Sequence, residues 1–473
     1  MNTSLFFVVV SAFFMTPVLL VAQKIAAGGR HSLAICADST VQSWGYNGFG
    51  QLGNGNILEQ HTATQVPGLT KIIQVAGGLF HSLFVKSDST VWACGRNSLG
   101  SLGDGSNTNK QSPVQVRGLS GIVRAAGGGE HSLFLNSDGT VWACGANSAG
   151  QLGDGTTAHK NIPVKVKGIT GVIQVAAGAE FSLFLKNDGT VWACGHNGFG
   201  QFGNGSTTSS NVPIQVGVLS GIIHISAGEW HSLFVKNDGT VYSSGRNQYG
   251  QLGDGSITNK NTASQVTALS GVTMAEAGGI HSVFVKNDGT VWSCGLNSGG
   301  NNDGQLGDGT ATDRHTPVQV VSTWASARII HAEATREHSL FLTEDGILWA
   351  SGRNNYGQLG NGTFSSVNST RPVVSNSVCS LLSTSVHIHD ESENEVVIYP
   401  NPFSVQTKIH INVRMQNITV HIYNVNGQLF RQITPLSGET IILHRGNLPS
   451  GLYHVHVSSN NRFITYNKLI ITD

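Results

Sequence analysis

The segment from 181 to 205, FSLFLKNDGTVWACGHNGFGQFGNG, contains several residue types that could do chemistry. Asp188, Cys194 and His196 are types that ligate metals, and they lie among glycine-rich turns. A functional site requires different groups that converge at one point. The copies of this segment elsewhere in the chain decide whether it is a site or a repeated structural element.

The segment recurs along the chain. Its first residue aligns with a column at intervals of 50 residues, then a last interval of 57: His31, His81, His131, Phe181, His231, His281 and His338. In most copies an apolar run such as HSLFV leads through Asn-Asp-Gly or Ser-Asp-Gly into a second run such as TVWACG, a pattern typical of a β-hairpin. Each copy then continues with G-Q-L-G-[DN]-G, a Pro-Val-x-Val strand and an Ile-x-x-Ala-x-Gly strand. The pattern predicts four short strands per unit.

Four antiparallel strands repeated every 50 residues are typical of a propeller blade, and seven units predict a closed ring. The chain begins its repeats at an Ile-Ala-Ala strand (25–27) and ends them at Pro-Val-Val (372–374). We therefore expect the two ends to share one blade, clasped by strand pairing across the seam.

The repeated pattern G-x-x-H-S-L…D-G-T-V-x-x-x-G-x-N-x-x-G-Q-L-G-[DN]-G resembles the regulator of chromosome condensation repeat family and covers residues 24–376. The resemblance implies an all-β fold, a seven-bladed propeller of four-stranded blades. Family members range from nucleotide exchange factors to secreted inhibitors of β-lactamases, so the fold does not fix the function.

Columns that repeat one residue type are interpreted as scaffold, and no metal site is expected in them. Phe181 replaces one histidine, so a ring of metal-binding histidines is not expected. The histidines are instead expected to satisfy backbone groups at the strand start. The cysteine column alternates with serine, which indicates a small packed side chain, and neighbouring blades should hold these sulfurs too far apart for a disulfide. The aromatic column is expected to pack between blades. The cysteine column reads Trp44, Cys94, Cys144, Cys194, Ser244, Cys294 and Ser351, and the aromatic column Trp92, Trp142, Trp192, Tyr242, Trp292 and Trp349.

The Asp-Gly pairs are interpreted as turns, because the glycine supplies a positive φ. Calcium binding by Asp303, Asp308 and Asp313 is the alternative, but their spacing fits no loop with a full set of oxygen ligands.

Recognition is expected where the copies differ. Three variable columns belong to loops that should share one end of the propeller, and they are rich in the aromatic and arginine side chains of binding hot spots. The predicted binding face consists of Arg30, Phe80, Glu130, Glu180, Trp230, Ile280 and Glu337 before the second strand, Tyr46, Arg96, His196, Arg246 and Arg353 after the third, and Phe49, Phe199, Tyr249 and Tyr356 further along the same loop.

An enzyme is the second hypothesis for the same face. Glu130 and Glu180 occupy matching places on adjacent blades, with Trp230 on the next, which is compatible with a glycoside hydrolase. The resemblance brings no hydrolase motif, and no Ser-His-Asp or phosphate-loop pattern is present. We therefore predict no catalytic residue and no cofactor.

Composition and the N-terminal segment limit the possible partners and the cellular location of the protein. Lys and Arg number 27 against 27 Asp and Glu, and charged residues make up only 11% of the chain. This composition argues against a nucleic-acid partner. Residues 1–22 are predicted to be a secretory signal peptide, with a retained membrane anchor as the alternative, and no later stretch is expected to span a membrane.

The tail differs from the repeats. Residues 377–395 are interpreted as a linker, and 396–473 as a small β-sandwich of about seven strands. The motifs YPNPF, YNVNGQ and LPSGLYHVHV resemble the C-terminal sorting domain of the type IX secretion system, with an ordinary binding module as the alternative. The resemblance implies that the secretion machinery recognises this domain.

Taken together, the sequence predicts a secreted or outer-membrane-attached monomer that binds a protein or a glycan through one loop face. The alternatives are a carbohydrate-active enzyme and a self-assembling surface protein.

Overall fold

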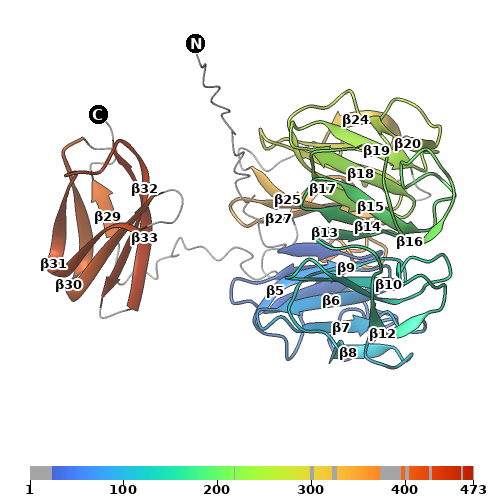
Figure 1. Ribbon diagram of the computed structural model, residues 1–473, viewed down its shortest axis with the longest axis horizontal. Coiled ribbons are helices and arrows are strands. Elements are labelled where there is room, and N and C mark those ends of the chain that lie inside the picture. The colour runs from blue at the N-terminus through green and yellow to red at the C-terminus, as the bar shows by residue number, and fades with distance from the viewer. Residues whose placement is uncertain are drawn as a thin grey trace, which may run out of the picture. The chain divides into compact units, whose positions relative to one another are not determined.

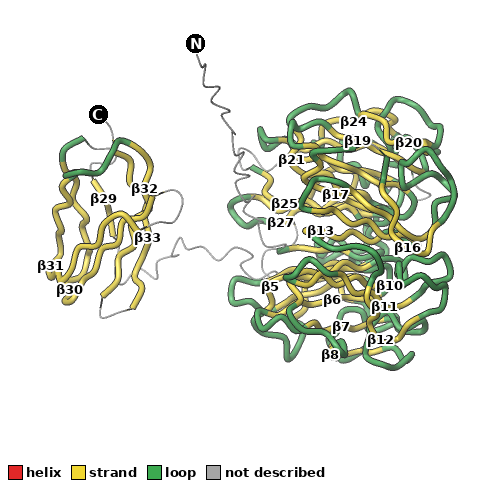
Figure 2. Tube along the Cα trace, in the orientation of Figure 1, coloured by secondary structure: helices red, strands yellow, loops and turns green. Residues whose placement is uncertain are grey.

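The computed structural model describes residues 24–217, 219–298, 303–321, 328–372, 396–399, 404–424, 429–459 and 462–471. Within these ranges the chain forms strands and loops and no helix (Figure 2). It divides into two compact units, residues 1–382 and 383–473. The predicted signal peptide (1–22) and linker (377–395) lie outside the described residues.

The first unit is a ring of seven four-stranded antiparallel sheets, as predicted (Figure 1). Blade 1 is β1 (Ile25–Ala27), β2 (His31–Ile35), β3 (Val41–Gly45) and β4 (Gln60–Gln65); blade 2 is β5 (Ile72–Gly77), β6 (His81–Lys86), β7 (Val91–Gly95) and β8 (Lys110–Gln115); blade 3 is β9 (Ile122–Gly127), β10 (His131–Asn136), β11 (Val141–Gly145) and β12 (Lys160–Lys165); blade 4 is β13 (Val172–Ala177), β14 (Phe181–Lys186), β15 (Val191–Gly195) and β16 (Ser210–Gln215). Blade 5 is β17 (Ile222–Ala227), β18 (His231–Lys236), β19 (Val241–Gly245) and β20 (Lys260–Gln265); blade 6 is β21 (Val272–Ala277), β22 (His281–Lys286), β23 (Val291–Gly295) and β24 (Arg314–Gln319); blade 7 is β25 (Ile329–Ala334), β26 (His338–Thr343), β27 (Leu348–Gly352) and β28 (Val367–Pro372).

The prediction that the two chain ends share one blade is wrong. β1 pairs with β2, and β28 pairs with β27, so every blade is built from four consecutive strands. The seam is closed instead by side-chain contacts between blades 7 and 1. Each blade boundary elsewhere in the ring is held by contacts of the same kind, so a shared strand is not needed for closure.

Tight hairpins join the second and third strands, as predicted from the Asp-Gly pairs. Gly139, Gly189 and Gly239 adopt φ of 78°, 76° and 78° at this turn. Blades 1 and 2 have serine there, and Ser39 and Ser89 are held at φ of 63° and 65°. Serine meets a steric cost in this left-handed region that glycine does not.

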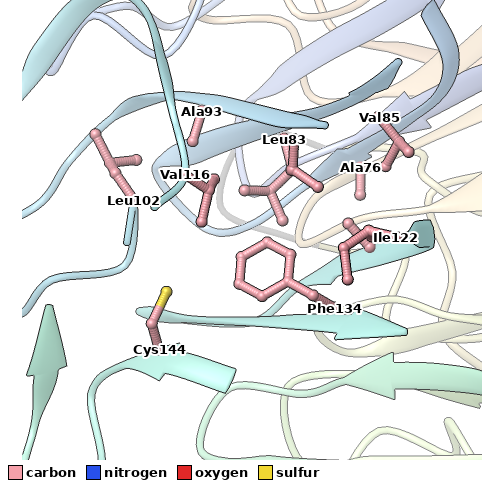
Figure 3. Packing of buried hydrophobic residues seen from close by; sticks show 11 residues of the cluster. Ala76, Leu83, Val85, Ala93, Leu102, Val116, Ile122, Phe134 and Cys144 are labelled. Carbon is pink, nitrogen blue, oxygen red and sulfur yellow. The ribbon is translucent and has the colours of Figure 1, made fainter. Parts of the chain in front are cut away.

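The core lies between adjacent blades. Phe134 of β10 is fully buried among Leu83, Val116 and Ile122, which come from blade 2 and from the inner strand of its own blade (Figure 3). Equivalent phenylalanines repeat this packing around the ring: Phe84, Phe184, Phe234, Phe284 and Phe341.

The predicted aromatic column has a smaller part in this core than expected. Trp142 is only partly buried at the edge of its cluster, whereas Phe134 is at the centre. In several blades a lysine lies over the ring, as Lys86 does over Trp92 at 5.7 Å from the ring centroid. These partly buried tryptophans therefore cover the edge of their cores and keep one face exposed to solvent, whereas Trp349 is 8% exposed and belongs to its core.

A histidine–serine contact joins neighbouring blades. The Nε2 atom of His81 lies 2.9 Å from the Oγ atom of Ser132, which itself donates to the carbonyl of Ser101. The serine proton is thus committed, so the imidazole donates from Nε2–H. The same contact recurs from His31, His131, His231, His281 and His338. The histidines therefore bind a side chain of the next blade, not backbone groups as predicted.

The residues of the cysteine column also join neighbouring blades, through contacts with a backbone carbonyl of the preceding blade. The Sγ atom of Cys94 lies 3.4 Å from the carbonyl oxygen of Gln51 in the preceding blade, and Ser244 and Trp44 donate to the equivalent carbonyls of Gln201 and Gln358. Cys94, Cys144, Cys194 and Cys294 are buried and free. Cys36, which the column does not include, is disulfide-bonded.

In the residues that the structure describes, the second unit contains five strands, where about seven were predicted. They are β29 (Val396–Tyr399), β30 (Gln406–Asn424), β31 (Leu429–His444), β32 (Gly451–Ser459) and β33 (Arg462–Ile471). β30 is long because its first half pairs with β29 and its second half with β32. Its core includes Ile409, Val420, Leu443 and Val455.

Candidate binding face

Two of the predicted columns meet in every blade. The backbone amide of the residue after the third strand donates to the carbonyl of the residue before the second strand, at 2.8 to 2.9 Å. The pairs are Tyr46 with Arg30, Arg96 with Phe80, Ala146 with Glu130, His196 with Glu180, Arg246 with Trp230, Leu296 with Ile280 and Arg353 with Glu337. The fold thus presents fourteen variable side chains around one end of the ring, which we call the loop face.

A first aromatic cluster spans blades 7, 1 and 2. The ring of Tyr46 lies 5.0 Å from that of Tyr356 and 6.2 Å from that of Phe80, centroid to centroid. Phe49 and Phe80 are 5.2 Å apart, and the rings meet edge to face. Such edge-to-face pairs stabilise one another beyond simple burial.

Every charge of this first cluster has a partner. Arg96 lies over Phe49 and forms an ion pair with Glu130, 2.5 Å from Nη1 to Oε1. Arg30 lies over the ring of Tyr356 and is 3.6 Å from the carboxylate of Glu337. The loop-face charges of this cluster, Arg30, Arg96, Glu130 and Glu337, are therefore paired with one another.

A second aromatic cluster lies on blades 4 and 5. The ring of Trp230 is 5.2 Å from that of His196 and 5.6 Å from that of Phe199. The guanidinium of Arg246 lies between Phe199 and Tyr249, 5.8 Å from each ring centroid.

The second cluster differs from the first in its charges. Glu180 is exposed, and its carboxylate forms no ion pair or hydrogen bond with the described residues. Arg246 binds only the side-chain amide oxygen of Gln248, at 2.7 Å, and forms no ion pair within the described part of the chain. An acidic and a basic group thus flank a half-buried aromatic surface, and neither forms an ion pair within the described part of the chain, although the charge of Arg246 also favours the ionised form of the nearby Glu229.

Three members of the columns contribute little. Ala146 is 7% exposed, so of these two columns only Glu130 presents a side chain on blade 3. Ile280 and Leu296 give blade 6 only aliphatic surface. The face is therefore asymmetric, although the scaffold beneath it is regular.

Sequence reasoning missed two charged residues at the centre of this face. Glu229 and Arg336 stand one position before Trp230 and Glu337, where other blades have a glycine, an alanine or a leucine, and their side chains are 3.2 Å apart. Burial raises the pKa of Glu229, and the nearby Arg336 opposes that shift. The same rule that identified the outer columns, a departure from the repeat, would have found this pair.

The repeated histidines and acidic turns are engaged within the protein. Burial lowers the pKa of His131 and His231 to about 3, so these rings are neutral and held by serine. Asp308, considered for calcium, is occupied by Thr310, Asn297 and Arg314. Among the residues that the structure describes, no group of three or more histidine, cysteine or acidic side chains is placed to hold a metal ion.

Comparison with family models covers nearly the whole chain. Residues 120–401 match the RCC1-like domain, and residues 38–85 and 88–135 match the regulator of chromosome condensation (RCC1) repeat. Residues 397–472 match the secretion system C-terminal sorting domain. That domain directs the chain to the cell surface or the extracellular space. In the described ranges no helix is long and apolar enough to cross a membrane.

Individual relatives support the fold alone. A curated relative, the mitochondrial RCC1 domain-containing protein RUG3 of Arabidopsis thaliana, is 44% identical over 46 residues, which is 10% of each chain. Human WBSCR16 has a TM-score of 0.63 at 24% identity, covering 71% of this chain and 93% of its own. Yeast RCC1 (Prp20), solved with Kap60, has a TM-score of 0.63 at 22% identity over 72% of this chain and 85% of its own. The chain belongs to the RCC1-like propeller family and carries a C-terminal sorting domain for secretion.

Proposed function

We propose that this protein is an exported propeller that binds a protein partner through the loop face, with its strongest contacts at the second aromatic cluster. The observation that carries this proposal is the contrast between the two clusters. Both are aromatic, but only the second leaves a carboxylate (Glu180) and a guanidinium (Arg246) without an ion-pair partner in the described part of the chain. Unpaired charges beside aromatic anchors favour recognition of complementary groups.

The location of the protein supports a partner outside the cytoplasm. The sorting domain directs secretion, and the disulfide at Cys36 is of a kind that persists in oxidising compartments. A partner of the exported propeller is therefore a secreted or surface protein, and the aromatic, mixed-charge character of the cluster matches a protein surface.

An enzymatic role for Glu130 and Glu180 has less support. The Glu130 carboxylate is engaged by Arg96, whereas Glu180 is exposed without a partner in the described ranges. A pair of catalytic carboxylates would both have to face the substrate. Sugar release by the purified propeller that is lost in Glu130→Gln would reverse this preference.

The proposal is tested by affinity capture with the mature chain as bait, followed by titration of the purified partner. We expect Trp230→Ala to weaken the complex about thirtyfold or more, as for a central hot-spot residue, and Arg246→Ala about tenfold. Leu296→Ala on blade 6 is the matched control and should bind like the parent. A partner bound equally by all three variants would contradict the proposed site, and capture of a glycan alone would contradict a protein partner.

A further inference from the structure

The central channel holds a second set of residues that depart from the repeat. Inside the ring lies a cavity of about 480 Å³, lined by the seven inner strands β1, β5, β9, β13, β17, β21 and β25. One lining column is alanine in blades 1 to 4 but becomes Ser226, Glu276 and Glu333 in blades 5 to 7. A ring of small residues (Ala27, Gly77, Gly127, Ala177, Ala227, Ala277 and Ala334) separates this cavity from the loop face.

One wall of the cavity is acidic and ordered. The carboxylate of Glu276 lies 3.0 Å from Nε2 of His224 and accepts a hydrogen bond from Ser226 at 2.9 Å. On the next blade Glu333 lies 3.0 Å from Nε2 of His331. These contacts hold two carboxylates, from adjacent blades, at the cavity surface.

The opposite wall is basic. Arg124 lines the same cavity from blade 3, and its guanidinium forms no hydrogen bond or ion pair with the residues described. The inner strands contact one another in ring order. Blade 3 therefore lies across the channel from blades 6 and 7, so the positive and negative groups face each other over the cavity.

Two pKa shifts agree with this polarity. Burial works against charge on His224, but its hydrogen bond with Glu276 and the nearby Glu333 raise its pKa overall, so the acidic wall favours a cation. Burial lowers the pKa of Arg124, and no partner among the described residues offsets the effect. The guanidinium is thus a cation without a counter-ion in this part of the chain.

Several of the other channel residues have a structural explanation. The side-chain amide of Gln74 exchanges two hydrogen bonds with the backbone of Ala125, and Gln174 does the same with Ile225. These amides pair the exposed edges of the inner strands. Arg124 occupies the equivalent position in blade 3 without such a contact, so edge pairing does not account for it.

We propose that the channel binds a short peptide with free termini, whose carboxylate pairs with Arg124 and whose ammonium group lies against Glu276 and Glu333. The cavity falls in the range of about 300 to 1,000 Å³ typical of small-ligand sites. Because the charges lie on opposite walls, the ligand must span the channel, which favours a peptide over a single amino acid. Three extended residues reach about 10 Å.

Trialanine is the probe, titrated calorimetrically into the mature chain and compared with its N-acetylated and C-amidated forms. We expect each capped form to bind about tenfold or more weakly, because each loses one charge-assisted contact. Arg124→Gln should weaken the binding of trialanine to a similar degree but leave binding of the amidated form, which lacks the carboxylate, unchanged. Glu333→Gln should likewise weaken the binding of trialanine but leave binding of the acetylated form, which lacks the ammonium group, unchanged. Met274→Leu, in the same column as Arg124, is the control.

The outcomes separate this site from the loop face. No heat of binding with trialanine, or equal binding of free and capped forms, would overturn the proposal, and the capped peptides test it on the parent protein even if a variant fails to fold. Binding unchanged by Arg124→Gln would also overturn it. Trp230→Ala should leave trialanine binding intact, so failure here and failure of the proposed function are distinguishable.

Discussion

The Nε2 atom of His338 in the last blade lies 3.0 Å from the Oγ atom of Ser32 in the first. Ser32 in turn donates to the carbonyl of Gln358, at 2.9 Å. The same arrangement joins blades 2 and 3 through His81 and Ser132. The seam is therefore closed by a contact of the same type as an interior boundary.

The serine of this contact should contribute measurably to stability. We expect Ser132→Ala to lower the free energy of unfolding by about 1 to 3 kcal/mol, because it leaves the buried Nε2–H of His81 without an acceptor. Ser232 is the natural control, since Phe181 stands where its histidine would be and it donates only to Gln201. Ser232→Ala should cost less by about 1 kcal/mol. Equal losses in urea unfolding would mean that the imidazole contact contributes nothing.

The buried histidines should make the propeller sensitive to acid. Burial, assisted by the nearby His81, lowers the pKa of His131 to about 3, whereas the unfolded chain has the ordinary value near 6.5. Between these values the unfolded state binds a proton that the folded state refuses, so stability is complete above pH 6.5 and falls towards pH 3.

His131→Phe, which copies the phenylalanine found naturally at position 181, should reduce this acid sensitivity. Each histidine removed should lower the pH dependence of the unfolding free energy by about 1.4 kcal/mol per pH unit. Phe181, the one position in this column without a histidine, provides the control, and Phe181→Leu should leave the slope unchanged. An unaltered slope in His131→Phe, measured by urea unfolding from about pH 4 to 7, would show that this ring is not kept neutral.

The repeat made most of the fold predictable. Strands, hairpins and the number of blades follow from local signals, because a turn such as Asn187 to Gly189 and the alternation around it recur seven times with little change. The prediction of a shared blade at the seam was wrong. Side-chain contacts such as that of His338 with Ser32 join the first and last blades without an exchanged strand. The partners of the repeated histidines could not be predicted from the sequence either, because His81 and Ser132 are 51 positions apart and only the packing of blades brings them together.

The candidate sites were predictable in part. The outer columns could be found because adjacent loops share one end of a propeller, which the topology alone dictates. Which charged side chains form ion pairs could not be predicted, because Arg96 pairs with Glu130 across a blade boundary while Glu180 stays unpaired among the described residues. The channel residue Arg124 could not be singled out either, because it lies within a strand, where a variable side chain is ordinarily explained by packing.

Cysteine chemistry should distinguish one disulfide from four inert thiols. Cys94, Cys144, Cys194 and Cys294 are fully buried, and burial raises the pKa of each thiol far above its ordinary value. Iodoacetamide should therefore leave these four thiols unmodified in the native protein and should label them once the chain is denatured. Cys36 should label only after reduction, and Cys379 lies outside the described residues. Peptide mapping by mass spectrometry that finds Cys36 alkylated without reductant would contradict this prediction.

The two hairpins that lack glycine offer a route to a more stable propeller. Ser89 is held at φ of 65°, where the conformation costs an L-residue about 1 to 2 kcal/mol that glycine avoids, and its hydroxyl forms no hydrogen bond with the described residues. After the entropy cost of glycine, Ser89→Gly should raise the free energy of unfolding by about 0.5 to 1 kcal/mol. Ser87→Gly, in the same turn but without a positive φ, should lower stability slightly or leave it unchanged. The reverse substitution Gly139→Ser should destabilise blade 3, because its Cβ would also meet the Cα atom of Gly171 at 3.0 Å. If Ser89→Gly and Ser87→Gly shift the urea midpoint alike, the left-handed backbone of blade 2 carries no strain and the glycines of the other turns are not there to relieve it.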